Sequence, residues 1–503
     1  MGENKHQNVS QPNILFIVWD SCAYETAYDE APVLNSLAES NVWFKNAISP
    51  SAWSLPTHTS FFDGRYPHEH GTYTGTDIMG EMPLGRILEQ KGYHRYGFSA
   101  NGFASYEYGF DENFDSFFST QGPMQSTHGV DLHRLSSTSS GGLSLSNIVS
   151  ETRQADQLTG SLLNLFAGSL SKVSSKYPAL RKLPHTLFQE HGFTYSPELN
   201  TRAIKHTIER EVHTDTPFFV FANYMDPHYP YVPPQHLQRD VCGEMFALSE
   251  LKKVHEICQP LKFKTRAVGD DIDHELLSTA AELYRAEVRS VDTHLQCIVD
   301  TLKRTGEWEN TLLIVTADHG EEVATVGPRL KQDSPEQVSE RLYAYDELYR
   351  TPLLVAGGWL SPATHRDYVS LKDLFELIAI AEEAREGGSK AVIDLLSPDR
   401  EFVAGQYPWI GYDRSILKEK YPSLPDIVID RHIIIGYSDE YKLVHTSKGE
   451  DWAMRDDSEV DPDEVPRSLY DFCHEQLDAF LDSEKRSQLN EQTADHLEEL
   501  GYL

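Results

Sequence analysis

The chain has 503 residues and carries 44 Lys and Arg against 78 Asp and Glu, so its formal net charge at pH 7 is −34. A surface this acidic repels nucleic-acid phosphates and anionic lipid head groups, which argues against nucleic-acid-binding and membrane-surface functions. The hydrophobic share of 39% is too high for a disordered chain, and the length suits one large domain with an appendage or two to three domains.

The five cysteines are scattered without a CxxC or CxH cluster, so the sequence predicts neither a disulfide framework nor a zinc ribbon. The N-terminus lacks the basic and apolar regions of a signal peptide, and no segment approaches the roughly 20 apolar residues that span a bilayer. We therefore expect a soluble, cytoplasmic protein without membrane insertion. The acid excess is typical of proteins from a salt-rich cytoplasm and predicts a halophilic, haloarchaeal source; ordinary solubility is the alternative explanation.

Three short apolar runs lead directly into acidic or histidine residues. The runs and the polar residues after them are 14–19 with Asp20, 218–221 with Asp226 and His228, and 312–315 with Asp318 and His319. Apolar runs without alternation are typical of strands buried on both faces of a parallel sheet. Because ligands bind at the carboxyl ends of such strands, we expect these polar side chains to gather at one edge.

The segment 51–71 predicts a short helix with a hydroxyl at its amino end. Pro56 suits a first helical turn and Gly64 suits the position after the last turn, so Ser54 falls at the start. The positive end of a helix lowers the pKa of a hydroxyl and attracts an anionic ester, although Ser54 as a plain N-cap is the simpler alternative. His58 is a candidate to orient or deprotonate that hydroxyl, or a structural histidine.

The later elements follow a helical and then a mixed pattern. Apolar residues at three- and four-residue steps predict a long helix over 276–302 that stops at Gly306. We expect a catalytic domain over 1–360, with a variable insertion at 120–195, and a smaller α+β subdomain over 361–503. Its expected elements are a helix at 369–381, a strand at 401–407, a hairpin at 433–445 and a helix at 467–481.

Asp20, Asp318 and His319 form a hard, oxygen-rich ligand set with one imidazole. Such a set suits one divalent ion among Mg²⁺, Mn²⁺, Ca²⁺ and Zn²⁺, and three ligands leave positions open for a nucleophile and a substrate. A single Asp at a strand end is more simply explained by a cap or a loop hydrogen bond. Two strand-end positions on matched apolar runs favour the metal site.

Several separate blocks resemble the sulfatases of the alkaline phosphatase superfamily, in the same order and at similar spacing. The blocks are PNILFIVWDS at 12–21, the segment 54–71, FANYMDPHYPYVPP at 221–234, the long block at 283–322, YDELYRTPLLV at 345–355, VSLKDLFELI at 369–378 and LEELGYL at 497–503. This resemblance implies an alkaline phosphatase-like α/β/α sandwich with a mainly parallel central sheet.

The resemblance also implies roles for individual residues. Asp20, Asp318 and His319 would bind the metal, and Ser54 would take the position of the nucleophile. His228 would contact the sulfuryl or phosphoryl oxygens or act on the leaving group. Further candidates for substrate contacts, with ordinary polar residues as the alternative, are Asn101, Asp226 and Arg341.

The chain departs from the family pattern at two positions. Sulfatases carry C/S-x-P-x-R, whose first residue is oxidised to formylglycine, whereas His58 replaces the arginine here and leaves formylglycine at residue 54 open. Asp20 is followed by Ser21 instead of a second Asp, which resembles the one-metal site of phosphoryl and phosphoglycerol transferases. A plain serine sulfate ester is also harder to turn over than a serine phosphate.

We therefore expect a metal-dependent hydrolase of sulfate esters that acts on a small-molecule or glycan ester by attack from residue 54. The first alternative is a phosphoric ester hydrolase or a phosphoglycerol-type transferase that uses unmodified Ser54. An alternative of another class is a catalytically silent protein that binds anionic glycans.

Overall fold

The computed structural model describes residues 11–75, 77–119, 197–259, 273–325, 327, 341–408, 431–456 and 458–482. The expected insertion at 120–195 and the block at 497–503 lie outside these ranges. Among the helices described, none combines the length and the apolar character that crossing a bilayer requires.

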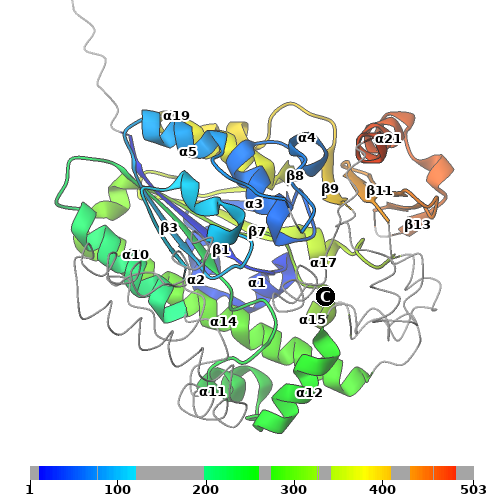
Figure 1. Cartoon of the computed structure of the whole chain (residues 1–503), viewed down its shortest axis with the longest axis horizontal. Helices are drawn as coiled ribbons and strands as arrows, with labels where there is room; N and C mark the ends of the chain where they lie inside the picture. The colour runs from blue at the N-terminus through cyan, green and yellow to red at the C-terminus, as the bar shows by residue number, and fades with distance from the viewer. Residues whose placement is uncertain are drawn as a thin grey trace, which may run out of the picture.

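A large sheet runs through the middle of the molecule (Figure 1). Its eight strands lie in the order β4-β3-β5-β1-β6-β7-β2-β8. β7 is antiparallel to both of its neighbours, and the other neighbouring strands are parallel. The strands are β1 (Asn13–Trp19), β2 (Val42–Ile48), β3 (His94–Ser99), β4 (Ser116–Ser119), β5 (Phe218–Tyr224), β6 (Thr311–Ala317), β7 (Arg350–Ala356) and β8 (Ala363–Ser370).

The three predicted apolar runs are the adjacent central strands β5, β1 and β6, and every residue of these strands is buried. Trp19 at the end of β1 pairs with Tyr224 of β5 and with Ala317 of β6. Their carboxyl ends are therefore level, so the residues that follow them emerge side by side. The predicted mainly parallel, doubly covered sheet is confirmed.

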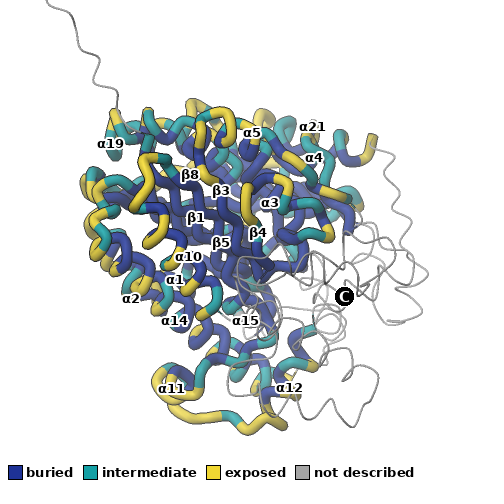
Figure 2. Tube along the Cα trace, turned by 60° about the vertical axis from the view of Figure 1, so that its left-hand side comes forward, coloured by how far each residue is buried: buried dark blue, intermediate teal, exposed yellow. Residues whose placement is uncertain are grey.

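Helices cover both faces of the sheet, and Figure 2 shows the buried strands between them. The helices on one face include α1 (Tyr24–Glu30), α2 (Pro32–Ala38), α10 (Pro197–Glu211) and α14 (His274–Thr305). The other face carries α3 (Ser54–Asp63), α5 (Pro83–Gln90), α18 (Leu374–Ala379) and α19 (Ala381–Leu396). α14 confirms the predicted long helix, which ends at the left-handed Gly306. Further helices are α4 (Pro67–His70), α11 (Gln235–Leu237), α12 (Leu248–Cys258), α15 (Glu322–Thr325) and α17 (Asp346–Tyr349).

A second, antiparallel sheet of five strands follows in the chain, in the order β13-β12-β11-β10-β9. Helix α21 (Arg467–Asp482) packs on β10 and β11. The predicted strand, hairpin and final helix of this region are confirmed. The strands are β9 (Val403–Tyr407), β10 (Ile433–Tyr437), β11 (Tyr441–Thr446), β12 (Trp452–Arg455) and β13 (Ser458–Val460).

The predicted helix at 369–381 is wrong in its first part. Val369 and Ser370 complete β8, where they pair with Ala47 and Ile48 of β2, and the helix α18 begins only at Leu374. Sheet pairing outweighs the helical spacing of the apolar residues here. Because β8, α18 and α19 all belong to the large sheet and its cover, elements of that sheet continue past residue 360; the domain division at 360 stays a prediction.

The second sheet is joined to the segment that precedes Ser54. Gln406 of β9 donates its backbone N–H to the Pro50 carbonyl over 3.0 Å, and the Ser51 hydroxyl donates to the Gln406 carbonyl over 2.9 Å. The Gln406 side chain also bonds His68 and Gln476 of α21. β9 thus acts as a bridge between α21 and the start of α3.

The packing of α21 on β10 can be tested at Gly436, where a Cβ would lie 2.5 Å from Cys473 Sγ and 2.7 Å from a Leu469 methyl group. We expect Gly436→Ala to lower the free energy of unfolding by about 1–3 kcal/mol, as overpacking does. Adding Cys473→Ala should restore part of this loss by removing one clash. Denaturant unfolding of the single and double variants measures both; an unchanged single variant, or a double variant without recovery, would contradict this packing.

Candidate active site

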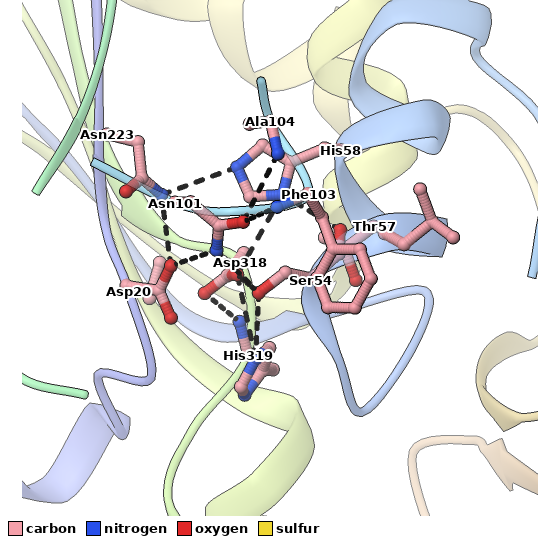
Figure 3. A network of polar contacts seen from close by, with 12 residues as sticks. Asp20, Ser54, Thr57, His58, Asn101, Phe103, Ala104, Asn223, Asp318 and His319 are labelled. Carbon is pink, nitrogen blue, oxygen red and sulfur yellow. Dashed lines mark hydrogen bonds and ion pairs between the residues drawn. The ribbon is translucent and has the colours of Figure 1, made fainter. Parts of the chain in front are cut away.

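The site lies where β1 and β6 end, facing the start of α3 (Figure 3). Asp20 follows β1, and Asp318 and His319 follow β6. One ligand atom from each of the three residues lies within 4.8 Å of the others, and all three residues are buried. The residues predicted to bind the metal are therefore brought together by the level ends of two neighbouring strands.

Ser54 is the first residue of α3, as the sequence predicts, and its hydroxyl points at these groups. Its Oγ donates a hydrogen bond to Asp318 Oδ2 over 2.7 Å and lies 3.4 Å from His319 Nε2. The N-cap of α3 is Trp53, and the helix ends at Gly64 with φ of 77°. The plain N-cap alternative for Ser54 is therefore wrong. The hydroxyl sits beside two potential metal ligands, at the positive end of the helix.

The turn after Asp20 is strained and held in place from α14. Ser21 has φ of 57°, a conformation that non-glycine residues rarely adopt. Its backbone N–H donates to Asp318 Oδ1 over 3.1 Å. The hydroxyl of Tyr284 donates to the Ser21 carbonyl over 2.8 Å and accepts the Ala23 N–H over 2.9 Å. The strained turn thus joins the ends of β1 and β6.

The electrostatics of the ligand set fit a cation. Burial and the charge of Asp318 raise the pKa of Asp20 to about 6. Burial also acts to raise the pKa of Asp318, but His319 and His58 outweigh it, so that this pKa is lowered. Burial opposes the charge of His319, yet the two carboxylates outweigh it and raise its pKa. Two adjacent buried carboxylates thus depend on nearby positive charge, which a divalent ion supplies.

His319 has the tautomer that a metal ligand needs. Its Nδ1 lies 2.8 Å from the Gly320 carbonyl and donates to it, which directs the Nε2 lone pair at the carboxylates. A backbone carbonyl on the far ring nitrogen is the usual partner of a metal-bound histidine. Asp20, Asp318 and His319 would therefore hold one divalent ion of the hard or intermediate kind.

Two buried amides complete the network. Asn101 was predicted only as a substrate contact; its Nδ2 donates to Asp20 Oδ2 and, over 2.9 Å, to Ser54 Oγ. Asn223 was not predicted: its Nδ2 donates to Asp20 Oδ2 over 3.2 Å and lies 3.4 Å from His58 Nε2. A polar residue near the end of an otherwise apolar strand is the signal that would have identified Asn223.

The two candidate histidines take different places. His58 Nδ1 lies 2.8 Å from the backbone carbonyl of Ser54, so the ring contacts the start of α3 through the carbonyl. His228 Nδ1 lies 2.6 Å from the Tyr229 carbonyl, and burial lowers the pKa of His228 against the opposing charge of Glu321. The charges of His319 and Asp318 also act on the pKa of His228.

The remaining two candidates contact other groups. Burial and the charge of Glu198 raise the pKa of Asp226 to about 7. Arg341 forms an ion pair with Glu459 of β13, Nη2 to Oε2 over 2.9 Å, and its guanidinium lies 5.6 Å from the ring centre of Trp452. These contacts of Arg341 are on the second sheet, away from the Asp318 network.

The family model described as "Sulfatase" matches residues 12–381. The curated protein "Uncharacterized sulfatase YidJ" of Escherichia coli K12 is 22% identical over 372 residues, which are 69% of this chain and 63% of that protein. The chain thus spans under two thirds of this relative. The predicted haloarchaeal source and cytoplasmic location stay predictions.

Solved structures share the fold. The phosphonate monoester hydrolase of Agrobacterium radiobacter superposes with a TM-score of 0.58 at 16% identity, covering 96% of this chain and 99% of that one. A protein solved with its substrate D-glucosamine-2-N,6-O-disulfate gives a TM-score of 0.57 at 14% identity, covering 95% and 100%. The predicted alkaline phosphatase-like architecture is confirmed by the sheet order and by these neighbours.

The Tyr284 hydroxyl clamps the strained turn after Asp20 through two hydrogen bonds. Removing this hydroxyl should make the position of Asp20 relative to Asp318 and His319 less well defined. In Tyr284→Phe the Ser21 carbonyl and the Ala23 N–H lose a buried partner, which costs about 1–3 kcal/mol of unfolding free energy. We also expect weaker binding of Mn²⁺, because the turn orients Asp20. Denaturant unfolding and calorimetric titration measure these effects, with Tyr28→Phe, an exposed tyrosine of α1, as the control. A Tyr284→Phe protein as stable as this control would refute the clamp.

The raised pKa of Asp226 predicts a pH-dependent stability. A folded-state pKa of about 7 against the ordinary value of 3.8 means that the protonated carboxyl is favoured in the folded protein. Its contribution to stability is full below the unfolded pKa and is lost as the pH rises through about 7. Asp226→Asn should therefore flatten the fall in unfolding free energy between about pH 4 and pH 8, whereas Asp29→Asn on the exposed face of α1 should not. Parallel curves for wild type and Asp226→Asn would contradict this.

Proposed function

Because the chain belongs to the sulfatase family of hydrolases, we propose that it hydrolyses a monoanionic ester, in the first place a sulfate ester, by in-line attack of the residue-54 nucleophile. One observation carries the proposal. The Ser54 hydroxyl donates to Asp318 Oδ2 over 2.7 Å at the amino end of α3, beside a donor set that fits a divalent ion. A nucleophile, a base that accepts its hydrogen bond and a site for a Lewis acid are thus in contact.

The charge of the site favours monoanions. In the described part of the chain, the groups whose charge acts most strongly to lower the pKa of Asp20 or Asp318 are two histidines, His319 and His58, and not a Lys or an Arg. One divalent ion would cancel the two carboxylates and leave the site near neutral. A second negative charge on a substrate would then be held without a partner, in a chain of net charge −34. Sulfate esters, phosphonate monoesters and phosphodiesters carry one charge, whereas phosphate monoesters carry two.

The residues of the chain divide the reaction between them. A bound divalent ion would polarise the ester oxygens and lower the pKa of the attacking group. Asp318 accepts the Ser54 hydrogen bond and so directs the hydroxyl lone pairs at the ester. The Asn101 amide, 2.9 Å from Ser54 Oγ, supports the negative charge that develops there. As the bond from Oγ to sulfur forms, the Ser54 proton passes to Asp318, the bond from sulfur to the alcohol oxygen breaks, and the leaving alkoxide takes up a proton from water.

The second half of the reaction needs a base for water. Because the pKa of His228 is lowered and its Nδ1–H donates to the Tyr229 carbonyl, Nε2 is the acceptor nitrogen of the neutral ring. His228 Nε2 would take the proton from the water that attacks the serine ester. The bond from Oγ to sulfur then breaks, Ser54 Oγ takes back its proton from Asp318, and sulfate leaves.

A second candidate is cleavage of a phosphonate monoester or phosphodiester with unmodified Ser54. The observation in its favour is His58, which stands where the sulfatase signature has arginine and which holds the Ser54 carbonyl over 2.8 Å. A plain serine ester of phosphate is opened by water more readily than one of sulfate. The phosphonate monoester hydrolase fold shows that this architecture accommodates such chemistry.

A panel of esters tests the proposal. The protein, loaded with Mn²⁺ at high salt, is assayed with 4-nitrophenyl sulfate, a phenylphosphonate monoester, bis(4-nitrophenyl) phosphate and 4-nitrophenyl phosphate. We expect kcat/KM for a monoanionic ester to exceed that for the dianionic phosphate by about tenfold or more, which corresponds to about 1.4 kcal/mol. Among the monoanions, we expect the sulfate ester to be the best substrate. A preference for the dianion would overturn the charge argument, and hydrolysis of the diesters without the sulfate would select the second candidate.

Variants and mass spectrometry test the nucleophile. Ser54→Ala should reduce kcat by about 10³-fold or more. Ser60→Ala is the matched control, because Ser60 is buried in the same helix but its hydroxyl pairs with His70. Peptide mass spectrometry shows whether residue 54 is formylglycine, which favours sulfate, or serine, which favours phosphorus. An unaffected Ser54→Ala protein would refute the mechanism, and a wild type that binds no Mn²⁺ would favour a silent, glycan-binding role.

A further inference from the structure

Asn223 is a buried amide at the centre of the large sheet. It is the penultimate residue of β5, fully buried, and pairs with Val18 of β1 and Ser99 of β3. Its backbone carbonyl accepts a hydrogen bond from the Asn200 side chain of α10 over 2.6 Å. Burying an amide in an apolar strand costs free energy unless the amide makes hydrogen bonds, so its partners are informative.

The orientation of the Asn223 amide is fixed by a carboxylate. Its Nδ2 lies 3.2 Å from Asp20 Oδ2, and an ionised carboxylate only accepts hydrogen bonds. A flipped amide would turn Oδ1 toward Oδ2 and replace attraction with repulsion. The second Nδ2 hydrogen is then available to His58 Nε2, at 3.4 Å (Figure 3).

The same orientation matches the tautomer of His58 that the Ser54 carbonyl requires. Since Nε2 faces an amide donor, it accepts, and the ring proton sits on Nδ1. Nδ1 lies 2.8 Å from the Ser54 carbonyl and donates to it. The His58 ring otherwise makes edge-to-face contacts with the apolar rings of Phe61, Phe110 and Phe221. Both nitrogens of His58 are thus committed, and neither accepts the proton of the Ser54 hydroxyl.

We propose that Asn223 is a positioning residue of the active site, which orders Asp20 and, through its hydrogen bond to His58, the first turn of α3 that presents Ser54. The Asn223 amide connects β1 with α3 through two hydrogen bonds. Its Nδ2 donates one to Asp20, which follows β1, and one to His58 of α3. This inference rests on the proposed function for the role of Ser54. It assigns His58 to positioning, in place of the base or orienter of the hydroxyl that the sequence suggested.

The kinetic test compares Asn223→Ala with a matched variant. We expect Asn223→Ala to reduce kcat by about 10- to 100-fold, the usual effect of losing a partner of a metal ligand, with KM changed by less than about threefold. Asn41→Ala is the control: Asn41 is equally buried and bonded to Leu37 and Gly357, but lies at the start of β2, at the opposite edge of the sheet. Equal losses of kcat in both variants would reduce Asn223 to a structural residue and overturn the proposal.

Nitrogen NMR of the histidines gives a readout that needs no turnover. The His58 signal is assigned by its disappearance in His58→Asn, a change that keeps an N–H donor near the position of Nδ1. We expect both proteins to keep the Nδ1–H tautomer that the Ser54 carbonyl requires, and the Nε2 signal of His58 to shift in Asn223→Ala because Nε2 loses a hydrogen-bond donor. Asn223→Ser, which keeps a small donor, replaces Asn223→Ala if the latter fails to fold. An unchanged Nε2 signal in folded Asn223→Ala overturns the link to His58.

Binding of Mn²⁺ completes the test. We expect Asn223→Ala to weaken Mn²⁺ binding in calorimetry by about 10-fold or more, because Asp20 loses one of its two amide donors. Unchanged binding overturns the link to Asp20. If wild type hydrolyses none of the esters, the proposed function fails, while the NMR and calorimetric results still decide the role of Asn223.

Discussion

The structure is arranged around two carboxylates that share one buried place. Asp20 and Asp318 follow neighbouring parallel strands whose ends are level, so the backbone register alone brings them together. Both are buried, and their mutual repulsion contributes to the raised pKa of Asp20. Such a pair is stable only with donors and positive charge around it. The surroundings of the site follow from this requirement.

The donors come from elements that are distant in the chain. Asp318 accepts hydrogen bonds from Ser54 of α3 and from the Ser21 amide of the strained turn. Asp20 accepts from the amides of Asn101 and Asn223, which follow β3 and lie in β5. Four strands and one helix therefore converge on the same oxygens. Ser54, the proposed nucleophile, is one of these donors, so the environment of Asp318 and the orientation of the Ser54 hydroxyl depend on the same hydrogen bond.

The sequence was most informative where backbone pattern decides the structure. Uninterrupted apolar runs predicted the three central strands, and the polar residues after them predicted the ligand set, because strand register leaves little freedom at a carboxyl end. The pattern was wrong at 369–370, where pairing with β2 outweighed helical spacing. Asn223 lies just past the predicted apolar run at 218–221, inside the longer strand β5, and ahead of the predicted polar residues Asp226 and His228. The contact of His58 with the Ser54 carbonyl depends on ring orientation, which spacing along a helix does not determine.

The bridge between β9 and the segment ahead of α3 has a further consequence. The family match ends at residue 381, yet Gln406 bonds Pro50 and Ser51, only a few residues before the nucleophile. The second sheet therefore supports the segment that leads into Ser54. Relatives that differ in this region would support that segment differently, so exchanging C-terminal regions between them would change the geometry at the Ser54 hydroxyl.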